Sequence, residues 1–230
     1  MDDMRLSDKD ENEKKTANTH LHIIEAYASL ATVCPDKRIK EKVRHLLDVF
    51  ANHIINKESN HLNLFMDENW IVRSSLVSYG HDIEAAWLLR ESAAAMTNDG
   101  KNINLFDELS IKLADAVVEG LDTDGGLWYE LEPSTGYLIK EKHSWSQAEA
   151  MLGFYSAYQL TGHEKYLDYS LNSWEFIKRH IKDQDKGEWF WGVREDYSVM
   201  NKEKAGFWKC PYHNARACME LLKRINDQTV

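Results

Sequence analysis

Residues 78–93 read SYGHDIEAAWLLRESA, and this stretch decides how the chain is interpreted. His81, Glu84 and Trp87 follow one another at intervals of three residues. At about 100° per residue in a helix, the three side chains fall within an arc of about 120° on one face. The stretch is either an ordinary amphipathic helix that begins with a histidine or one wall of a reaction site. The rest of the sequence distinguishes the two.

The composition is that of a folded, acidic protein. A chain of 230 residues can bury a sizeable core, and its 43% hydrophobic and 29% charged residues are ordinary for a globular domain. The net charge of -10 argues against a nucleic-acid partner, and there is no apolar run long enough to span a membrane. The polar first residues do not form a signal peptide, and the scattered Cys34, Cys210 and Cys218 indicate reduced thiols. We therefore expect a cytoplasmic protein.

Helical segments alternate with turn-rich segments in an order that repeats. Apolar residues at helical spacing predict two helices followed by an excursion with turns and short β-prone runs, three times over, and then one last helix. The leading helices begin roughly 62–68 residues apart, a longer period than in common solenoids. The predicted helices cover residues 17–33, 37–55, 80–96, 103–121, 145–160, 164–181 and 212–225.

The leading helix of each pair is less charged than its partner. Residues 83–96 (IEAAWLLRESAAAM) are mostly apolar or small, whereas residues 37–47 (KRIKEKVRHLL) alternate charged and apolar positions. Helices that are apolar around most of their surface lie inside a fold, and one-sided helices lie outside. The sequence therefore predicts an all-α, α/α toroid with short β-hairpin excursions, forming a single domain over residues 1–230. Residues 1–16 are expected to be flexible or irregular.

The beginnings of the four inner helices share a chemical character. In such a ring these N-termini gather at one end, and each of them contains a histidine. Taken singly, a histidine at a helix start is more often structural, and a first-turn glutamate commonly just complements the helix dipole. Recurrence at one end favours a functional site. The four segments are NTHLH (18–22), YGHDIEAAW (79–87), HSWSQAEA (143–150) and CPYHNAR (210–216).

Two further features concern metals and sugars. His20 and His22 are two residues apart on a helix and point away from each other, so we do not expect them to share a metal ion. Flat aromatic faces beside charged groups suit sugars, and the excursions hold four tryptophans next to such groups. Some of these rings could instead close small cores under the loops, as we expect for Trp128. The excursion residues in question are Trp128, Trp189, Trp191, Trp208, Glu130, Glu188 and Arg194.

Histidine as the recurrent group suggests proton transfer. An unperturbed histidine titrates near pH 6.5, so it can both remove and return a proton near neutrality. The positive end of a helix disfavours imidazolium and keeps such a histidine available as a neutral base. Two histidines on opposite sides of a sugar carbon fit a reaction that takes a proton from one face and returns it to the other. In an open-chain aldose this carbon is C2, and a third group would help to open the ring.

Four motifs occur in this order along the chain: NTHLHIIEAY, SYGHDIEAAWLL, WSQAEAMLGFYSAYQLTG and AGFWKCPYHNARACMELLKRI. They closely resemble the N-acylglucosamine 2-epimerase superfamily and, within it, the cellobiose 2-epimerases. The resemblance covers nearly all of the chain from about Leu6. It implies an (α/α)6 barrel, of which this chain supplies the C-terminal portion of three helix pairs and a single helix. By this resemblance the chain would lack the family's N-terminal part, including an arginine that contacts substrate. An open half-ring exposes its end helices, which implies self-association or a missing N-terminal half as partner.

The resemblance also implies roles for individual residues. His81 and His213 would be the general acid/base pair at C2, acting through a cis-enediolate, and His22 would assist ring opening. No metal or nucleotide cofactor is implied.

The resemblance also implies substrate-binding residues. Asn18 and Glu84 would form hydrogen bonds with sugar hydroxyls, and Glu149 would orient a histidine or the substrate. Trp145 and Trp208 would stack on sugar rings, and Trp87 would shape the pocket.

The expected activity is interconversion of glucose and mannose at the reducing end of a β-linked disaccharide. One alternative is an N-acylglucosamine or monosaccharide 2-epimerase, which activity on N-acetylmannosamine but not on disaccharides would favour. The other is a truncated, non-catalytic sugar-binding remnant, which ligand binding without isotope exchange would identify. In each case the ligand is a small sugar, and neither nucleic acid nor a membrane is an expected partner.

Overall fold

The computed structural model describes residues 13–34, 36–96 and 100–227. The segment expected to be irregular falls mostly on residues 1–12, which lie outside the described residues, and Lys15–Thr16 form a short strand. The prediction of seven main helices is confirmed. They are α1 (Ala17–Val33), α2 (Lys37–Val49), α3 (Tyr79–Ala94), α4 (Gly100–Val117), α5 (Ser144–Thr161), α6 (Glu164–Phe176) and α7 (Tyr212–Asp227).

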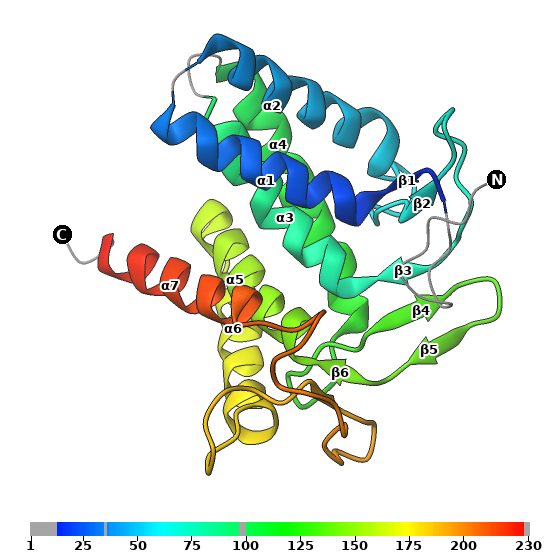
Figure 1. Ribbon diagram of the computed structural model, residues 1–230, viewed down its shortest axis with the longest axis vertical. Helices are drawn as coiled ribbons and strands as arrows, with labels where there is room; N and C mark the ends of the chain where they lie inside the picture. The colour runs from blue at the N-terminus through cyan, green and yellow to red at the C-terminus, as the bar shows by residue number, and fades with distance from the viewer. Residues whose placement is uncertain (1–12, 35, 97–99, 228–230) are drawn as a thin grey trace.

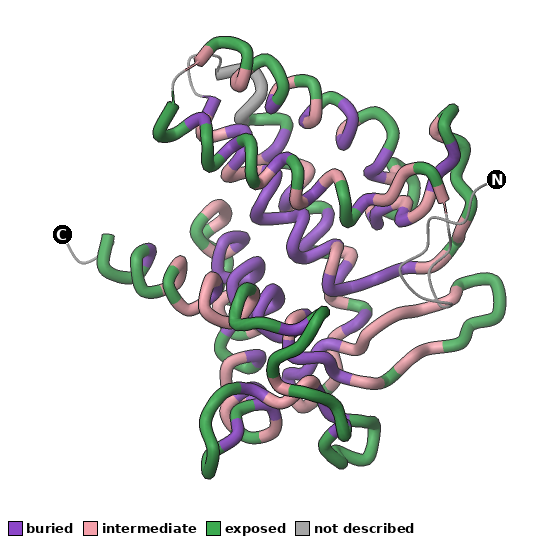
Figure 2. The backbone as a smooth tube through the Cα atoms, viewed as in Figure 1, coloured by how far each residue is buried: buried purple, intermediate pink, exposed green. Residues whose placement is uncertain are grey.

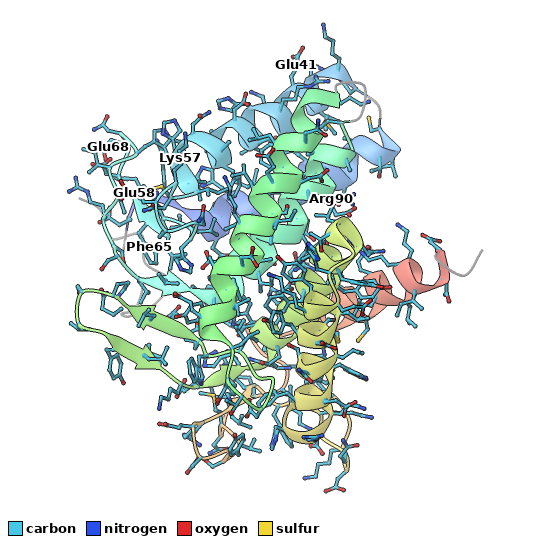
Figure 3. The ribbon with its side chains drawn as sticks, turned by 180° about the vertical axis from the view of Figure 1, so that it is seen from behind. Glu41, Lys57, Glu58, Phe65, Glu68 and Arg90 are labelled. Atoms are coloured by element: carbon cyan, nitrogen blue, oxygen red, sulfur yellow. The ribbon has the colours of Figure 1, made fainter. Side chains whose placement is uncertain are left out.

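The helices form part of an α/α ring with an inner and an outer layer (Figure 1). α1, α3, α5 and α7 pack side by side in chain order, and α2, α4 and α6 each pack on the inner helix that precedes them. The view from behind shows the outer helices in front of the inner row (Figure 3). Among the described residues, no helix is long and apolar enough to cross a membrane.

The two central inner helices are buried almost all round, as their low charge predicts (Figure 2). Close packing between them depends on Gly153 in α5. A Cβ atom at this position would lie 2.6 Å from Cγ1 and 2.8 Å from the carbonyl oxygen of Ile83 in α3. Both distances are too short for any residue with a side chain. Gly153 therefore allows the α3 and α5 backbones to approach each other.

Short antiparallel strands tie the starts of the first three inner helices, α1, α3 and α5, to the excursions of their own repeats. In each of the three repeats, the strand that leads into the inner helix pairs with a strand that follows the outer helix. The second excursion adds a hairpin strand, β5 (Tyr137–Ile139). The three pairs are β1 (Lys15–Thr16) with β2 (Phe65–Met66), β3 (Val77–Ser78) with β4 (Glu130–Glu132), and β6 (Lys142–His143) with β7 (Gly192–Val193).

Side chains in the first turns of α3 and α5 fix neighbouring excursions to these helices. Asp82 accepts a hydrogen bond from the Leu62 amide at 2.8 Å, and Gln147 accepts one from the Leu127 amide at 2.7 Å. Each bond joins an inner helix to the excursion of the preceding repeat. Both satisfy a buried backbone donor, which would otherwise be costly. The N-terminal ends of the inner helices and the excursions thus form one rigid end of the ring.

Candidate active site

All four inner helices contribute to a cavity of about 780 Å³ at this end of the ring. Seven of the nine residues singled out in the sequence line it, and they come from segments almost 200 residues apart. The other two, Trp87 and Glu149, lie behind the cavity wall and are buried. The seven lining residues are Asn18, His22, His81, Glu84, Trp145, Trp208 and His213.

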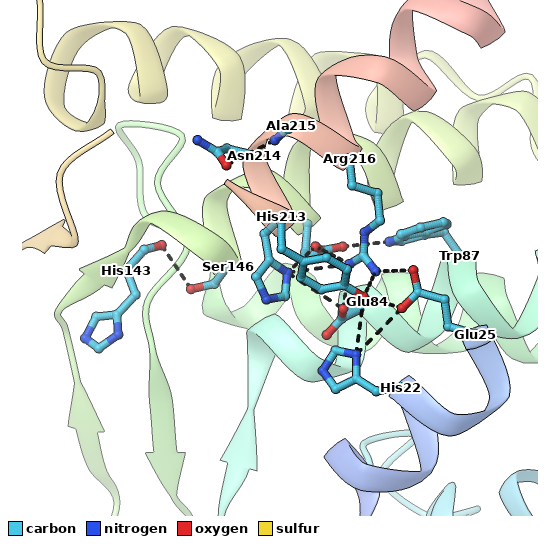
Figure 4. A network of polar contacts seen from close by, with 12 residues as sticks. His22, Glu25, Glu84, Trp87, His143, Ser146, His213, Asn214, Ala215 and Arg216 are labelled. Atoms are coloured by element: carbon cyan, nitrogen blue, oxygen red, sulfur yellow. Dashed lines mark hydrogen bonds and ion pairs between the residues drawn. The ribbon is translucent and has the colours of Figure 1, made fainter. Parts of the chain in front are cut away.

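Arg216 of α7 joins the three other inner helices and was not identified from the sequence (Figure 4). Its Nη1 donates to Oε1 of Glu25 in α1 at 2.6 Å. Its Nη2 donates to Oε1 of Glu84 in α3 and to Oε1 of Glu149 in α5, both at 2.6 Å. The guanidinium also lies 4.9 Å from the centroid of the Trp87 ring. Arg216 therefore balances one carboxylate from each of the other three inner helices.

The two deepest carboxylates of this cluster are in opposite electrostatic situations. Burial raises the pKa of Glu84, and the nearby charge of Glu149 raises it further. Burial also opposes ionisation of Glu149, but its hydrogen bond with His213 and the charge of Arg216 bring the pKa of Glu149 below its ordinary value. Glu149 therefore stays ionised while Glu84 takes up a proton more readily, a division typical of sites that handle protons.

Glu149 orients His213 and does not itself face the cavity. Its Oε1 accepts a hydrogen bond from Nδ1 of His213 at 2.6 Å, and its Oε2 accepts one from Nε1 of Trp87 at 2.8 Å. An ionised carboxylate can only accept, so Nδ1 of His213 carries the hydrogen in this assignment. Nε2 is then the nitrogen of His213 that can exchange a proton with a ligand. Trp87, behind Glu149, holds the carboxylate in place.

His81 is neutral in this environment. Its Nδ1 lies 2.8 Å from Oγ of Ser78, and its ring centroid lies 4.8 Å from that of Trp145. Burial, together with the nearby His22 and His213, lowers the pKa of His81 to about 3. When Ser78 accepts from Nδ1, Nε2 of His81 presents a lone pair to the cavity.

His22 is protonated more readily than an ordinary histidine. The Glu25 carboxylate, whose Oε2 lies 3.6 Å from Nδ1 of His22, raises the pKa of His22 against the opposing effect of burial. Although burial opposes ionisation of Glu25, the interactions with His22, Arg216 and Tyr212 lower its pKa to about 2. The neighbouring His20 instead contacts the Thr16 carbonyl at 2.7 Å, so the two histidines diverge as expected.

The side chains of His22, His81 and His213 surround one part of the cavity. The His22 and His213 centroids are 6.4 Å apart, and Trp145 lies 5.4 Å from His213 and 4.8 Å from His81. Trp145 is thus between the two histidines expected to act at C2, where an aromatic face can support a sugar ring.

Further residues that were not among the nine predicted site residues also line the cavity. The His143 ring stacks on Tyr129 with centroids 3.9 Å apart, and Lys202 lies 4.6 Å from the centroid of the Trp191 ring. The excursion tryptophans divide into two groups. Trp128, as expected, and Trp189 pack on the core under the loops, whereas Trp191 and Trp208 line the cavity.

One cluster in the site has the spacing of metal ligands. Atoms of Glu84, Glu149 and His213 lie within 4.8 Å of one another. However, the Arg216 guanidinium already donates to both carboxylates. Its positive charge takes the place that a cation would have, so we assign the cluster to proton and charge balance.

Gly80 at the start of α3 provides a test of the cavity wall. A Cβ atom there would lie 2.5 Å from Cη2 of Trp145 and 2.8 Å from Cβ of Ser146. In Gly80→Ala we expect Trp145 to be displaced, with a loss of about 1–3 kcal/mol from overpacking. A rise in KM and a change in tryptophan fluorescence would report the displacement. Unchanged fluorescence and KM would show that Trp145 is not held against Gly80.

Comparison with known proteins gives a consistent set of relatives. The family model described as N-acylglucosamine 2-epimerase (GlcNAc 2-epimerase) matches residues 3–217. A cellobiose 2-epimerase of Bacteroides fragilis is 48% identical, and the match covers 96% of this chain and 56% of that protein.

Solved structures agree with this match. A sugar epimerase from a ruminal bacterium superimposes with a TM-score of 0.92 and 33% identity, covering 97% of this chain and 58% of that one. The cellobiose 2-epimerase from Bacillus thermoamylovorans gives a TM-score of 0.88 and 37% identity, covering 96% of this chain and 56% of that one. The chain therefore spans a little over half the length of these relatives.

Proposed function

Since the chain belongs to the N-acylglucosamine 2-epimerase family, a family of carbohydrate 2-epimerases, we propose that its cavity inverts C2 of the reducing-end sugar of a β-linked disaccharide. The reaction would interconvert glucose and mannose at that position. The observation that carries the proposal is the pair His81 and His213. Both line the cavity, and in both the Nδ1 atom is engaged by the protein. The Nε2 atoms remain for the substrate.

Ring opening is the first step, and His22 is the group suited to it. The sugar must convert from the hemiacetal to the open-chain aldehyde, which requires a proton to be delivered to the ring oxygen and one to be removed from the hydroxyl on C1. Because its pKa is raised, His22 holds a proton more readily than an ordinary histidine. We assign it the transfer to the ring oxygen, and solvent water would take the proton from the C1 hydroxyl.

Inversion at C2 then needs a base on one face and an acid on the other. One histidine removes the C2 proton through Nε2, and the C–H electron pair moves to form a cis-enediolate with the negative charge on the former carbonyl oxygen. The other histidine delivers a proton to the opposite face of C2, which restores the aldehyde. Glu149 supports this cycle because an ionised acceptor on Nδ1 stabilises His213 while it is protonated.

Substrate binding falls to the remaining cavity residues. Oε2 of Glu84 is buried and has no hydrogen-bond partner among the described residues, so it can accept a bond from a sugar hydroxyl. Asn18 offers an amide at the same end of α1. Trp145 lies inside the cavity, and Trp208 lines its exposed mouth. We assign Trp145 to the reducing-end ring and Trp208 to the second ring.

The reaction can be tested directly by isotope exchange. Incubation with cellobiose in deuterated water is expected to place deuterium at C2 and to produce the epimer, both readable by NMR. Exchange with N-acetylmannosamine but with no disaccharide would favour a monosaccharide-type epimerase. Saturable sugar binding without any exchange would instead identify a non-catalytic binding protein and refute the proposed reaction.

A pH profile tests the role of His22. The alkaline limb of activity is expected to follow loss of the His22 proton, and Glu25 is the largest cause of the raised pKa. Glu25→Gln removes the negative charge that favours the protonated ring, so the limb should move to lower pH. The measurement is kcat against pH for both proteins. An alkaline limb at the same pH in the variant would remove His22 from the ring-opening step.

A further inference from the structure

Tyr212 lies between two histidines of the cavity, and the proposed reaction gives it no role so far. It is the first residue of α7, directly before His213, and it lines the cavity. The centroid of its ring lies 4.8 Å from that of His213 and 5.7 Å from that of His22. The Arg216 guanidinium lies over the ring, 4.3 Å from its centroid. Tyr212 is therefore fixed on α7 and reaches a histidine of α1.

The Tyr212 hydroxyl has three hydrogen-bonding neighbours. They are Oε2 of Glu25, Nη1 of Arg216 and Nδ1 of His22, the last at 3.3 Å. A hydroxyl has one hydrogen to donate and two lone pairs that accept. The guanidinium can only donate, and the ionised Glu25 carboxylate can only accept. The hydroxyl hydrogen therefore goes to Glu25, and the oxygen accepts from Arg216 and from Nδ1 of His22.

The hydroxyl connects two groups that do not form a hydrogen bond with each other. Nδ1 of His22 is 3.6 Å from Oε2 of Glu25, which is longer than a hydrogen bond. The other oxygen of Glu25, Oε1, accepts from Nη1 of Arg216 at 2.6 Å, and this bond holds the carboxylate in place (Figure 4). Burial and the hydrogen bond to Glu25 raise the pKa of Tyr212, so the hydroxyl keeps its hydrogen. The hydrogen-bonded path from His22 to Glu25 thus passes through Tyr212.

The same arrangement occurs at each histidine of the proposed reaction. Nδ1 of His213 donates to Glu149, and Nδ1 of His81 lies 2.8 Å from Oγ of Ser78. With the tyrosine hydroxyl on His22, all three histidines have Nδ1 engaged by an oxygen of the protein. In each of them Nε2 is the nitrogen left for the sugar. An oxygen on Nδ1 is therefore a recurrent means of orienting the histidines of this cavity.

We propose that Tyr212 is a positioning residue for ring opening, whose hydroxyl bridges Nδ1 of His22 to the Glu25 carboxylate and so directs Nε2 of His22 at the sugar. The role rests on the proposed function, because it serves the same proton transfer. Nε2 gives its proton to the ring oxygen as the bond from C1 to that oxygen breaks and water takes the proton of the C1 hydroxyl. The neutral imidazole keeps the hydrogen on Nδ1, which still donates to Tyr212. His22 thus keeps its orientation, and Nε2 regains a proton from solvent.

Two substrates separate ring opening from the chemistry at C2. Tyr212→Phe removes the hydroxyl and keeps the aromatic ring. Exchange at C2 of cellobiose in deuterated water is expected to fall by about 10- to 100-fold in this variant, because a small misplacement of a reacting group can cost about 100-fold. The second substrate is 4-O-β-D-glucosyl-L-threose, whose reducing unit ends at C4 and has no hydroxyl free to close a ring. Its C2 exchange needs no ring opening, so this exchange should persist in Tyr212→Phe.

NMR of the protein without sugar tests the bridge independently of any reaction. With isotope-labelled imidazole nitrogens, the neutral His22 ring of the parent is expected to carry its hydrogen on Nδ1. In Tyr212→Phe the hydrogen should move towards Nε2, because Glu25 lies beyond hydrogen-bonding distance of Nδ1. Tyr27→Phe is the matched control, since Tyr27 is an exposed tyrosine on the same helix as His22 and should change neither the exchange nor the tautomer.

The outcomes separate this inference from the proposed reaction. The inference is overturned if folded Tyr212→Phe, verified by circular dichroism, exchanges cellobiose as fast as the parent, loses exchange of both sugars equally, or keeps the neutral His22 hydrogen on Nδ1. If the parent exchanges only cellobiose, loss of that exchange together with the change of tautomer supports the inference. If the parent exchanges neither sugar, the proposed reaction is refuted, and the His22 tautomer decides whether the bridge exists.

Discussion

Arg216→Met is expected to destabilise the fold by about 3–5 kcal/mol, the usual cost of removing one partner from a buried ionic cluster. Arg216 donates to carboxylates from α1, α3 and α5, and two of them, Glu84 and Glu149, are almost completely buried. Without the guanidinium these carboxylates remain close together with no cation between them. The proposed epimerase activity should fall as well, because Glu149 would no longer be held in position against His213.

Urea denaturation of Arg216→Met and of the parent protein gives the difference in stability. Arg90→Met is the matched control, because Arg90 makes longer ion pairs at a half-exposed site and should cost no more than about 1 kcal/mol. The loss of stability in Arg216→Met should become smaller as pH falls, since Glu84 has a raised pKa and becomes neutral first.

A second substitution identifies the source of the deficit. Glu84→Gln removes one of the two buried charges that Arg216→Met leaves uncompensated. The double variant Arg216→Met with Glu84→Gln should therefore be more stable than Arg216→Met alone. If the two changes are instead simply additive, Arg216 does not stabilise the fold through the carboxylate cluster.

The architecture could be predicted from the sequence because it depends on local patterns that repeat. Low charge in residues 83–96 and alternating charge in residues 37–47 distinguish inner from outer helices before any contact is known. Once the layers are assigned, the common direction of the inner helices brings their first residues together. His22, His81 and His213 could therefore be placed around one cavity, although they come from distant segments.

What the sequence could not provide is the pairing between helices within the site. Arg216 is three residues after His213, so it is on the same helical face, but nothing local indicates three carboxylates from other helices. The role of Glu149 was left open between a histidine and the substrate for the same reason. The structure places it against His213, where only the packing of α5 on α7 determines the choice.

In the excursions, too, the sequence alone could not show which side chains face the cavity. Trp189 and Trp191 are two residues apart in similar surroundings, yet one packs on the core and the other lines the cavity. Residues two apart in a regular strand point to the same side, so the two rings diverge because the backbone bends at Trp191, between the bridge at Trp189 and β7. Residue composition suggested a sugar site in these loops, but only the strand pairing specifies which ring faces it.

His81→Gln and His213→Gln are each expected to reduce inversion at C2 by about 10²–10⁴-fold, the usual contribution of one general acid or base. The two variants should nevertheless differ in a way that structural damage would not produce. Each retains one of the two histidines, and that histidine can still remove the C2 proton of the epimer whose hydrogen faces it. In deuterated water, one variant should exchange the C2 hydrogen of the glucose form, and the other that of the mannose form.

This complementary pattern follows from the geometry of the pair. If the two histidines act on opposite faces, loss of one blocks inversion but leaves proton removal and return on the remaining face. A single shared base would instead couple exchange and inversion, and one variant would then lose both for both epimers. NMR of each separate epimer in deuterated water distinguishes the two cases. His143→Gln is the matched control: His143 lines the outer end of the same cavity but has no place in the proton path, so both exchange and inversion at C2 should persist.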